Sequence, residues 1–259
     1  MPRDLIHTSH RLLFVAACVV AGAPTAPAQE SLRKAGNSLI APAEVVLYIQ
    51  SDLKSTDFVQ PLVCALQHVL TAPVSTQILD LPLGSELLAT PTQFDVGKVA
   101  GRFIQATAAD GGSRSFKYLL MPFDLKAEPW RYVFSSSFGD EKTHVGVLST
   151  VRLDPGDPRH QHSQGGEVTA MRAYKLILKS IARLAGLTSP DACVLAFPRS
   201  LDELDRKSSD FCPDDRAALI AAGILKSRKG QDGLEGTDCV VVSQRVPAAS
   251  VTRVSSRTD

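Results

Sequence analysis

The sequence predicts an α/β fold, in which a mixed, largely parallel sheet is packed with helices and is followed by a short C-terminal helical part. Two observations carry this prediction. In the first half of the chain, runs of β-forming residues alternate with segments whose apolar residues recur at helical spacing. Strands that alternate with helices form parallel sheets, because each helix returns the chain to the edge where the next strand begins. The second half adds one long helical pattern and a shorter one.

The individual elements follow in chain order. Strands are expected at Val45–Gln50, Thr76–Leu81 and Lys117–Phe123, with amphipathic helices over residues 59–70 and 96–104 between them. Two neighbouring strands are then expected at Arg131–Ser137 and His144–Thr150. The helices of the second half are expected at Val168–Gly186, where the glycine ends the helix, and at Pro213–Leu225.

The N-terminus has the pattern of a secretory signal peptide. Arg3 and Arg11 precede a short apolar run, and a small-x-small cleavage pattern ends at Ala28. The run is shorter than the roughly 20 residues that a membrane span needs, so we expect no transmembrane span in the mature chain. Residues 1–28 are therefore a predicted signal peptide, and the protein is expected to be secreted or periplasmic. The alternative is a lipoprotein anchored through Cys18.

The remaining residues divide into three parts by composition. Residues 29–44 form a polar leader, residues 45–226 the folded domain, and residues 227–259 a tail that we expect to be mostly disordered. The net charge of +1 gives no electrostatic reason to expect a nucleic-acid partner. An exported chain permits disulfides. Cys64 is expected in the core, and Cys239 has no predicted partner.

The segment after the long helix carries the most specific motif. Residues 193–195 are CVL and residues 200–215 are SLDELDRKSSDFCPDD. Together with Arg172 and Lys175 upstream, these segments resemble the corresponding parts of the archaemetzincins, small zinc metalloproteases of the metzincin group. The resemblance extends over about residues 45–225 and implies a metzincin-like fold.

The resemblance places the zinc motif of that family, HExxHxxGxxH, on residues that are unsuited to zinc. Counted from Gly186, the first His, the Glu, the second His and the third His fall on Lys179, Ser180, Arg183 and Thr188 or Ser189. Lys179 and Arg183 share a helix face, but an ammonium and a guanidinium have no lone pair to offer a metal. Ser180 cannot replace the glutamate as a base. We therefore expect a degenerate member with no catalytic residues and no zinc cofactor.

The archaemetzincins also hold a second, structural zinc with four cysteines. Cys193 and Cys212 fall on two of these positions, and Asp215 falls on a third. In an exported protein the resemblance implies that a Cys193–Cys212 disulfide replaces this zinc. The alternative is a pair of buried free thiols.

One function class compatible with these residues is an exported archaemetzincin-like pseudo-metalloprotease that is not catalytic. Its role would be binding or structural, in the cell envelope, with an unknown protein or peptide as its partner. Lys179 and Arg183 would then form a cationic groove for an anionic ligand such as a peptide carboxylate. The alternative is that both cations are solvated or paired with Asp202, Glu203 or Asp205.

The other function class is an active metallopeptidase, or another hydrolase, with a rearranged metal site. His160 and His162 have the H-x-H spacing that can chelate a metal ion. The alternative is that both histidines belong to a solvated loop rich in glycine and proline.

Overall fold

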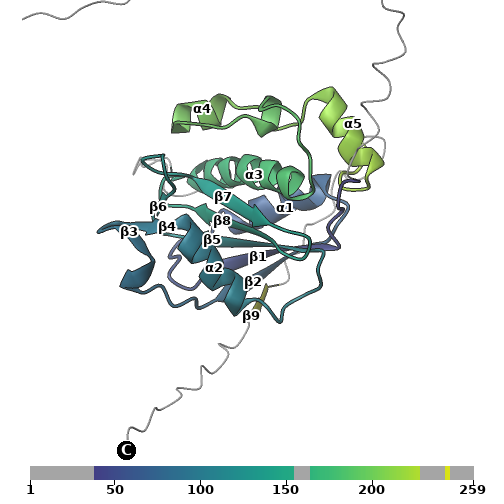
Figure 1. The fold of residues 1–259 in the computed structure, drawn as a ribbon. Coiled ribbons are helices and arrows are strands. Elements are labelled where there is room, and N and C mark those ends of the chain that lie inside the picture. Colours follow the sequence, from purple (N-terminus) through teal and green to yellow (C-terminus); the bar gives the residue numbers. More distant parts are fainter. Residues whose placement is uncertain (1–37, 155–163, 228–242, 246–259) are drawn as a thin grey trace, which may run out of the picture. The chain divides into compact units, whose positions relative to one another are not determined.

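A large sheet of six strands forms the centre of the computed structural model, which describes residues 38–154, 164–227 and 243–245 (Figure 1). The strands are β1 (Glu44–Gln50), β2 (Val74–Leu79), β5 (Ser115–Met121), β7 (Ser135–Gly139), β8 (His144–Ser149) and β9 (Ser243–Arg245). Their order across the sheet is β7-β8-β5-β1-β2-β9. All neighbours pair in parallel except β7, which is antiparallel to β8. The predicted mixed, largely parallel sheet is confirmed.

Helices cover both faces of this sheet. Helices α1 (Val59–Val69) and α3 (Gln164–Leu184) lie on one face, and α2 (Val96–Ala106) lies on the other (Figure 1). Strand β1 shows the consequence for the sequence. Val45 and Leu47 are buried with α1 and α3, whereas Val46 and Tyr48 are buried with α2. Successive side chains of a strand point to opposite faces, so a strand covered on both sides is apolar throughout.

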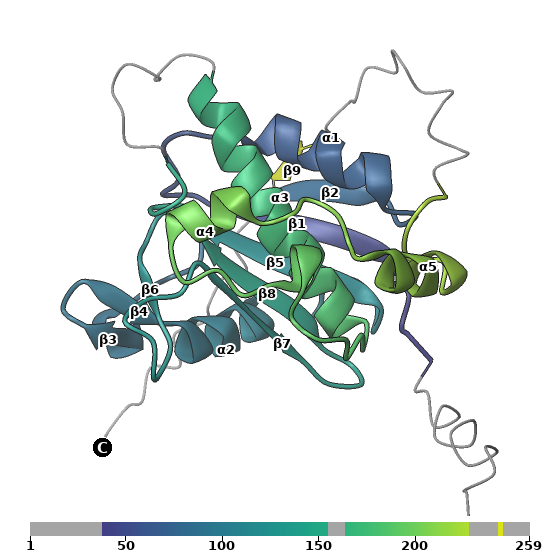
Figure 2. The same ribbon diagram turned by 90° about the horizontal axis from the view of Figure 1, so that it is seen from above.

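The C-terminal helical part lies against α3. It consists of the short turn η4 (Cys193–Leu195), α4 (Leu201–Arg206) and α5 (Pro213–Ala221), and α4 lies over α3 in both ribbon views (Figure 2). Ser200 precedes α4, and its hydroxyl accepts a hydrogen bond of 3.2 Å from the amide of Glu203. Helix α5 begins with Pro213, a residue suited to the first turn because its missing N–H would be unpaired there.

Several short elements were not predicted. A second sheet contains β3 (Leu88–Thr90), β4 (Gln93–Asp95) and β6 (Leu125–Lys126), and η2 (Ser85–Leu87) precedes it. Strands of two or three residues are too short to show a period of two in the sequence. Strand β9 lies within the tail that was expected to be mostly disordered, and it pairs with β2. Strand β7 begins at Ser135, later than the predicted start at Arg131.

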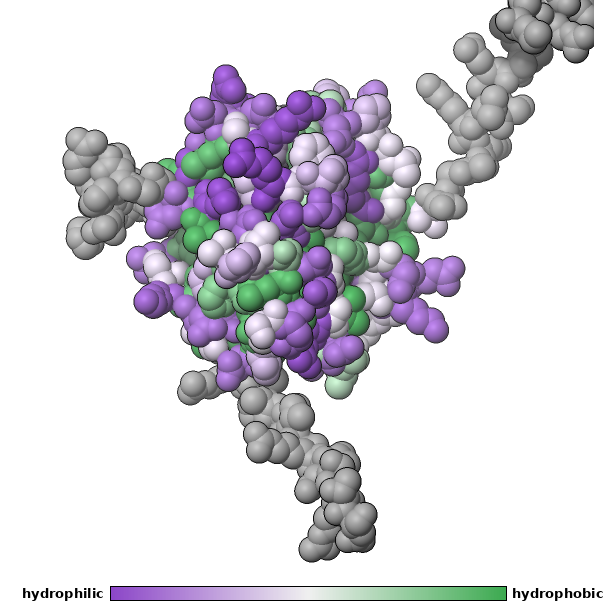
Figure 3. All heavy atoms as spheres, turned by 60° about the vertical axis from the view of Figure 1, so that its left-hand side comes forward, coloured by the Kyte–Doolittle hydropathy of each residue, from purple (hydrophilic) through white to green (hydrophobic). Residues whose placement is uncertain are grey.

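Several sequence predictions lie outside the described residues. They concern the signal peptide (1–28), Cys18, the histidines His160 and His162, and Cys239. In the part of the chain that the structure describes, no helix is both long and apolar enough to cross a membrane. On the face drawn in Figure 3, hydrophilic residues surround apolar residues that reach the surface in the middle.

Candidate binding cleft

Helix α3 carries the candidate site, and the glycine that anchors the motif, Gly186, follows its last residue Leu184 by two positions. Gly186 has a φ of 95°, a left-handed conformation that glycine adopts without steric cost. Its amide donates to the carbonyl of Arg183 over 3.0 Å, and the amide of Leu187 donates to the carbonyl of Ala182 over 2.9 Å. This pair of hydrogen bonds is a Schellman motif. The chain therefore turns away from α3 within one turn of Arg183.

The first two cations on α3 hold the C-terminal helical part in place. Arg172 donates from Nε and Nη2 to the two carboxylate oxygens of Asp205, over 2.7 and 2.6 Å, and from Nη1 to the carbonyl of Leu153 over 2.6 Å. Lys175 donates to the carbonyls of Leu204 and Asp205, over 3.0 and 2.8 Å. Both cations are buried. The hydrogen bonds from Arg172 hold the pKa of the Asp205 carboxyl below its usual value.

The next two cations, Lys179 and Arg183, converge on one carboxylate. Arg183 Nη2 lies 2.6 Å from Asp191 Oδ1, and Nη1 donates to the carbonyl of Leu187 over 2.8 Å. Lys179 Nζ lies 3.6 Å from Asp191 Oδ2, which is longer than an ordinary hydrogen bond. Burial lowers the pKa of Lys179; Asp191 opposes this shift and Arg183 adds to it.

The ion-pair partner of Lys179 and Arg183 differs from the candidates that the sequence suggested. Asp202, Glu203 and Asp205 were the expected candidates, but Asp191 pairs with both Lys179 and Arg183. Asp205 binds Arg172 instead. The difference arises after Gly186, where the Schellman turn directs the loop containing Asp191 back along the end of α3.

The two serines of the degenerate motif have separate surroundings. Ser180 is buried beside Tyr118, and the two hydroxyls lie close together without making a hydrogen bond of ordinary geometry. Ser189 donates a hydrogen bond to the carboxylate of Asp215. The resemblance matches Ser189 to a catalytic zinc ligand and Asp215 to a structural zinc ligand, and in this structure the two side chains are hydrogen-bonded to each other.

This set of side chains does not fit a catalytic zinc ion. Lys179 and Arg183 are cations without a donor lone pair, and a neutral serine hydroxyl is a poor zinc ligand. Across residues 38–154, 164–227 and 243–245, no group of three or more His, Cys, Asp or Glu side chains is placed to hold a metal ion.

A disulfide joins Cys193 to Cys212, as predicted. The two Cα atoms are 5.5 Å apart, and beside the bridge the amide of Val194 donates to the carbonyl of Asp210 over 2.9 Å. The bridge links the start of η4 to the residue before α5. The expectation that Cys64 is a plain core residue is wrong, because Cys64 is only half-buried and is also disulfide-bonded.

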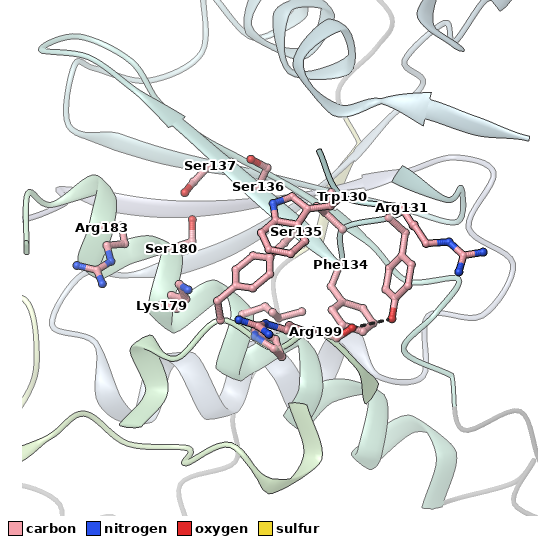
Figure 4. Close-up of a pocket in the computed structure, with 15 residues that line it drawn as sticks. Trp130, Arg131, Phe134, Ser135, Ser136, Ser137, Lys179, Ser180, Arg183 and Arg199 are labelled. Atoms are coloured by element: carbon pink, nitrogen blue, oxygen red, sulfur yellow. Dashed lines mark hydrogen bonds between the residues drawn. The ribbon is translucent and has the colours of Figure 1, made fainter. Parts of the chain in front are cut away.

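A cavity of about 360 Å³ lies where α3, β7 and the loop before α4 meet (Figure 4). The lining residues come from three segments, which are residues 130–137, the α3 residues Leu176, Lys179, Ser180 and Arg183, and residues 197–199. The rings of Trp130 and Phe197 pack at a tilt of 33° with a centroid distance of 5.0 Å, and Tyr132 donates to the carbonyl of Arg199 over 3.1 Å. We call this cavity the cleft.

The described residues that line the cleft carry only positive charges. They include Arg131, Lys179, Arg183 and Arg199 and no aspartate or glutamate. Figure 4 shows Lys179 and Ser180 on the helix facing the serines of β7, while the Arg131 side chain points away from Lys179 at the other end. Lys179 Nζ also lies 5.2 Å from the ring centroid of Phe197. The cleft thus combines an aromatic wall with positive charge.

One further titratable residue near the cleft was missed by the sequence analysis. Lys207 is buried, and its Nζ has no hydrogen-bond partner among the described residues. Burial lowers its pKa to about 7, and the nearby Lys179 and Lys175 lower it too, while Asp191 opposes them. Its place in the DELDRKSSDFC segment was visible, but nothing in the sequence showed that its ammonium would be buried beside other lysines.

The aromatic wall of the cleft was also missed. Trp130 and Phe197 are 67 positions apart in the sequence, and no local pattern connects them. Their exposed fractions, 42% and 39%, are high for such large apolar side chains. An exposed aromatic pair is a signal that only the folded structure provides.

Comparison with known proteins supports the archaemetzincin resemblance. A zinc-dependent peptidase from Methanocorpusculum labreanum is similar to the chain at 25% identity and a TM-score of 0.54, covering 68% of this chain and 100% of that one. An archaemetzincin from Archaeoglobus fulgidus, solved in complex with malonate, matches at 20% identity and a TM-score of 0.50, covering 68% of this chain and 99% of that one.

A third solved structure agrees with these two. The archaemetzincin from Methanopyrus kandleri matches at 20% identity and a TM-score of 0.50, over 69% of this chain and 94% of that one. No protein-family model and no curated protein matches the sequence. The chain is therefore archaemetzincin-like, with the fold of these zinc peptidases and, in its described residues, no group that could hold a metal ion.

Proposed function

We propose that the protein is an exported, non-catalytic pseudo-metalloprotease that binds a peptide segment in the cleft. The observation that carries this proposal is the replacement of the zinc-ligand positions on α3 by Lys179 and Arg183, which line the cleft and pair with Asp191. Two such cations repel a zinc ion and attract an anionic ligand. The same helix face that presents imidazoles in a peptidase here presents positive charge.

The position of β7 supports a peptide as the ligand. Strand β7 is at one edge of the large sheet, and its residues Ser135, Ser136 and Ser137 line the cleft. An edge strand has backbone N–H and C=O groups on one side that are available to pair with an added strand. Trp130 and Phe197 provide apolar area for side chains of that strand. Backbone pairing, aromatic contact and positive charge together suit an extended peptide with an acidic group.

Export is the second part of the proposal. The predicted signal peptide ends at Ala28, and the Cys193–Cys212 disulfide suits an oxidising compartment. Expression of the full chain with its own N-terminus, followed by N-terminal sequencing of the exported product, is expected to give a chain that begins at Gln29. A product that stays inside the cell with Met1 intact, or one cut before a lipid-modified Cys18, would contradict this part.

The non-catalytic part is tested by metal content and activity measured on the same exported protein. We expect well below one zinc per chain by elemental analysis, and no hydrolysis of a randomised peptide mixture with or without a chelator. The mixture should nevertheless be retained by the immobilised protein, because binding does not need the metal. Stoichiometric zinc together with chelator-sensitive hydrolysis would overturn the proposal and point to a site that includes His160 and His162.

A further inference from the structure

The groove between β7 and α3 closes at one end. A Cβ atom on Gly139, the last residue of β7, would lie 2.8 Å from Cδ2 of Leu184, so the strand and the helix are in direct contact there. The β7 residues that line the cleft, Ser135 to Ser137, all precede this contact. A continuous peptide must leave a groove at both ends, whereas a peptide terminus can stop at a closed end.

The positive charges beside the closed end of the groove favour the carboxy terminus of a peptide over its amino terminus. Lys179 and Arg183 lie on the last two turns of α3, within about one and a half turns of Leu184. None of the described residues that line the cleft is acidic, and the Asp191 carboxylate is shared between these two cations. A peptide amino terminus is a cation and would be repelled here, whereas a terminal carboxylate is attracted.

Of these two cations, Lys179 has more N–H donors available for a ligand. Arg183 commits Nη1 to the carbonyl of Leu187 and Nη2 to Asp191, over 2.8 and 2.6 Å. Among the described residues, the one ion-pair contact of Lys179 Nζ is the longer 3.6 Å contact to Asp191, and the Lys179 side chain is 18% exposed. A carboxylate that enters the cleft would therefore meet an ammonium that is largely shielded from water, where a charge-assisted hydrogen bond is strong.

We propose that the cleft captures the free carboxy-terminal end of an extended peptide, with the terminal carboxylate at Lys179 and the last side chain against Phe197 and Trp130. This inference rests on the proposed peptide binding and narrows it from a peptide segment to a peptide terminus. The 5.2 Å separation between Lys179 Nζ and the Phe197 ring centroid places the carboxylate receptor and the aromatic wall within reach of one terminal residue.

The test compares two mixtures of labelled octapeptides, randomised at every position, that differ only at the C-terminus. One mixture carries the free acid and the other carries the amide, and both contain the same internal acidic side chains. Equilibrium retention by the immobilised, oxidised full chain is expected to favour the free acid by about tenfold, since one charge-assisted hydrogen bond is lost in the amide.

Two variants make the result specific to the cleft. Lys179→Met is expected to reduce the preference for the free acid to near onefold while the protein keeps the thermal unfolding profile of the parent. Lys54→Met removes an exposed lysine outside the cleft lining and is expected to leave the preference unchanged.

The possible outcomes separate this inference from the proposed function. Equal retention of acid and amide would overturn the capture of a terminus and leave peptide binding in place. A preference that survives in a folded Lys179→Met protein would also overturn it. Retention of neither mixture would overturn both proposals.

Discussion

Arg183 Nη2 lies 2.6 Å from Asp191 Oδ1, so the residue that the resemblance matches to the second zinc histidine is one half of an ion pair. The same aspartate lies 3.6 Å from Lys179, at the first histidine position. A carboxylate between two cations offsets part of their mutual repulsion, as a shared counter-ion does. The loop that follows α3 is thereby held to the last two turns of that helix.

Asp191→Asn is expected to reduce stability and increase ligand binding together. Loss of the negative charge leaves Lys179 and Arg183 without their shared partner, and because the pair is partly exposed the loss should be only about 1 kcal/mol in the free energy of unfolding. The same change removes a competitor for Lys179, so retention of the free-acid peptide mixture should increase. Urea unfolding and peptide retention are the two measurements.

Asp202→Asn is the control for that variant. Asp202 is exposed on α4, and within the described part of the chain its side chain forms no ion pair with Lys179 or Arg183. The Asp202→Asn protein should match the parent both in its free energy of unfolding and in the amount of free-acid peptide mixture that it retains. An Asp191→Asn protein that unfolds like the parent and binds no more peptide would show that Asp191 neither balances nor competes for the two cations.

Removal of the Cys193–Cys212 bridge is expected to destabilise the C-terminal helical part. The cysteines are 19 residues apart, and a loop of this size is worth about 3 kcal/mol in the chain-entropy account of disulfides. The double variant Cys193→Ser/Cys212→Ser should therefore have a lower Tm than the parent in calorimetry under oxidising conditions.

A reducing agent provides the control for the bridge. Cys64 is also disulfide-bonded, so reduction should lower the Tm of the double variant further. A double variant with the Tm of the parent would mean that the Cys193–Cys212 bridge does not stabilise the folded protein. If a reducing agent left the Tm of the double variant unchanged, this would contradict the disulfide bond of Cys64.

Lys207→Met is expected to stabilise the protein and to remove part of its pH dependence. The folded protein lowers the pKa of Lys207 from 10.5 to about 7, so between these values the unfolded chain binds a proton that the folded chain does not. Stability of the parent should accordingly rise as the pH increases from about 7 toward 10, and the full penalty should be present below pH 7. Replacing a buried, unpaired ammonium by an apolar side chain should add about 1–3 kcal/mol at neutral pH.

Urea unfolding of parent and variant across pH 6.5 to 9.5 measures this effect. The variant should show a flatter curve, and Lys54→Met, which changes an exposed lysine, should follow the parent curve. If Lys207→Met is less stable than the parent at every pH, Lys207 holds a charge that the fold needs.

Arg172→Lys is expected to be far from conservative. Arg172 forms three hydrogen bonds of 2.6–2.7 Å, two to Asp205 and one to the carbonyl of Leu153, and an ammonium cannot reproduce this planar arrangement. We expect a loss of about 2–4 kcal/mol, because a buried carbonyl and part of a carboxylate lose their donors. Arg102→Lys, at the exposed ion pair with Glu86, should cost less than about 0.5 kcal/mol. Equal losses in the two variants would contradict the special role of Arg172.

The sequence predicted the scaffold of the site well, because the scaffold depends on local patterns. The helical spacing of apolar residues and the Gly186 stop placed α3, and the four-residue offset put Lys179 and Arg183 on one face. The paired cysteines followed from the family resemblance and are joined in the structure. Each of these features is set by residues within a few turns of one another or by a motif with fixed spacing.

The arrangement of side chains in and around the cleft depends on contacts between segments that are distant in the sequence. These contacts could not be predicted from the sequence. Asp191 reaches the two cations only because of how the loop after Gly186 turns, and three other acidic residues were equally plausible partners from sequence alone. Trp130 and Phe197 meet across 67 positions. The lowered pKa of Lys207 results from burial beside Lys179 and Lys175, which no local pattern encodes.

Strand β9, only three residues long, lies next to β2 at the border of the large sheet opposite β7. A border strand this short offers few free backbone groups, which discourages other chains from joining the sheet there. Strand addition is therefore directed to β7, and the two edges of the sheet differ. One edge is covered by the short strand β9, and the other, β7, faces the cleft. A chain shortened to end at Lys226 would lose this asymmetry, expose the flank of β2, and gain a second place where strands could assemble, with self-association as the result.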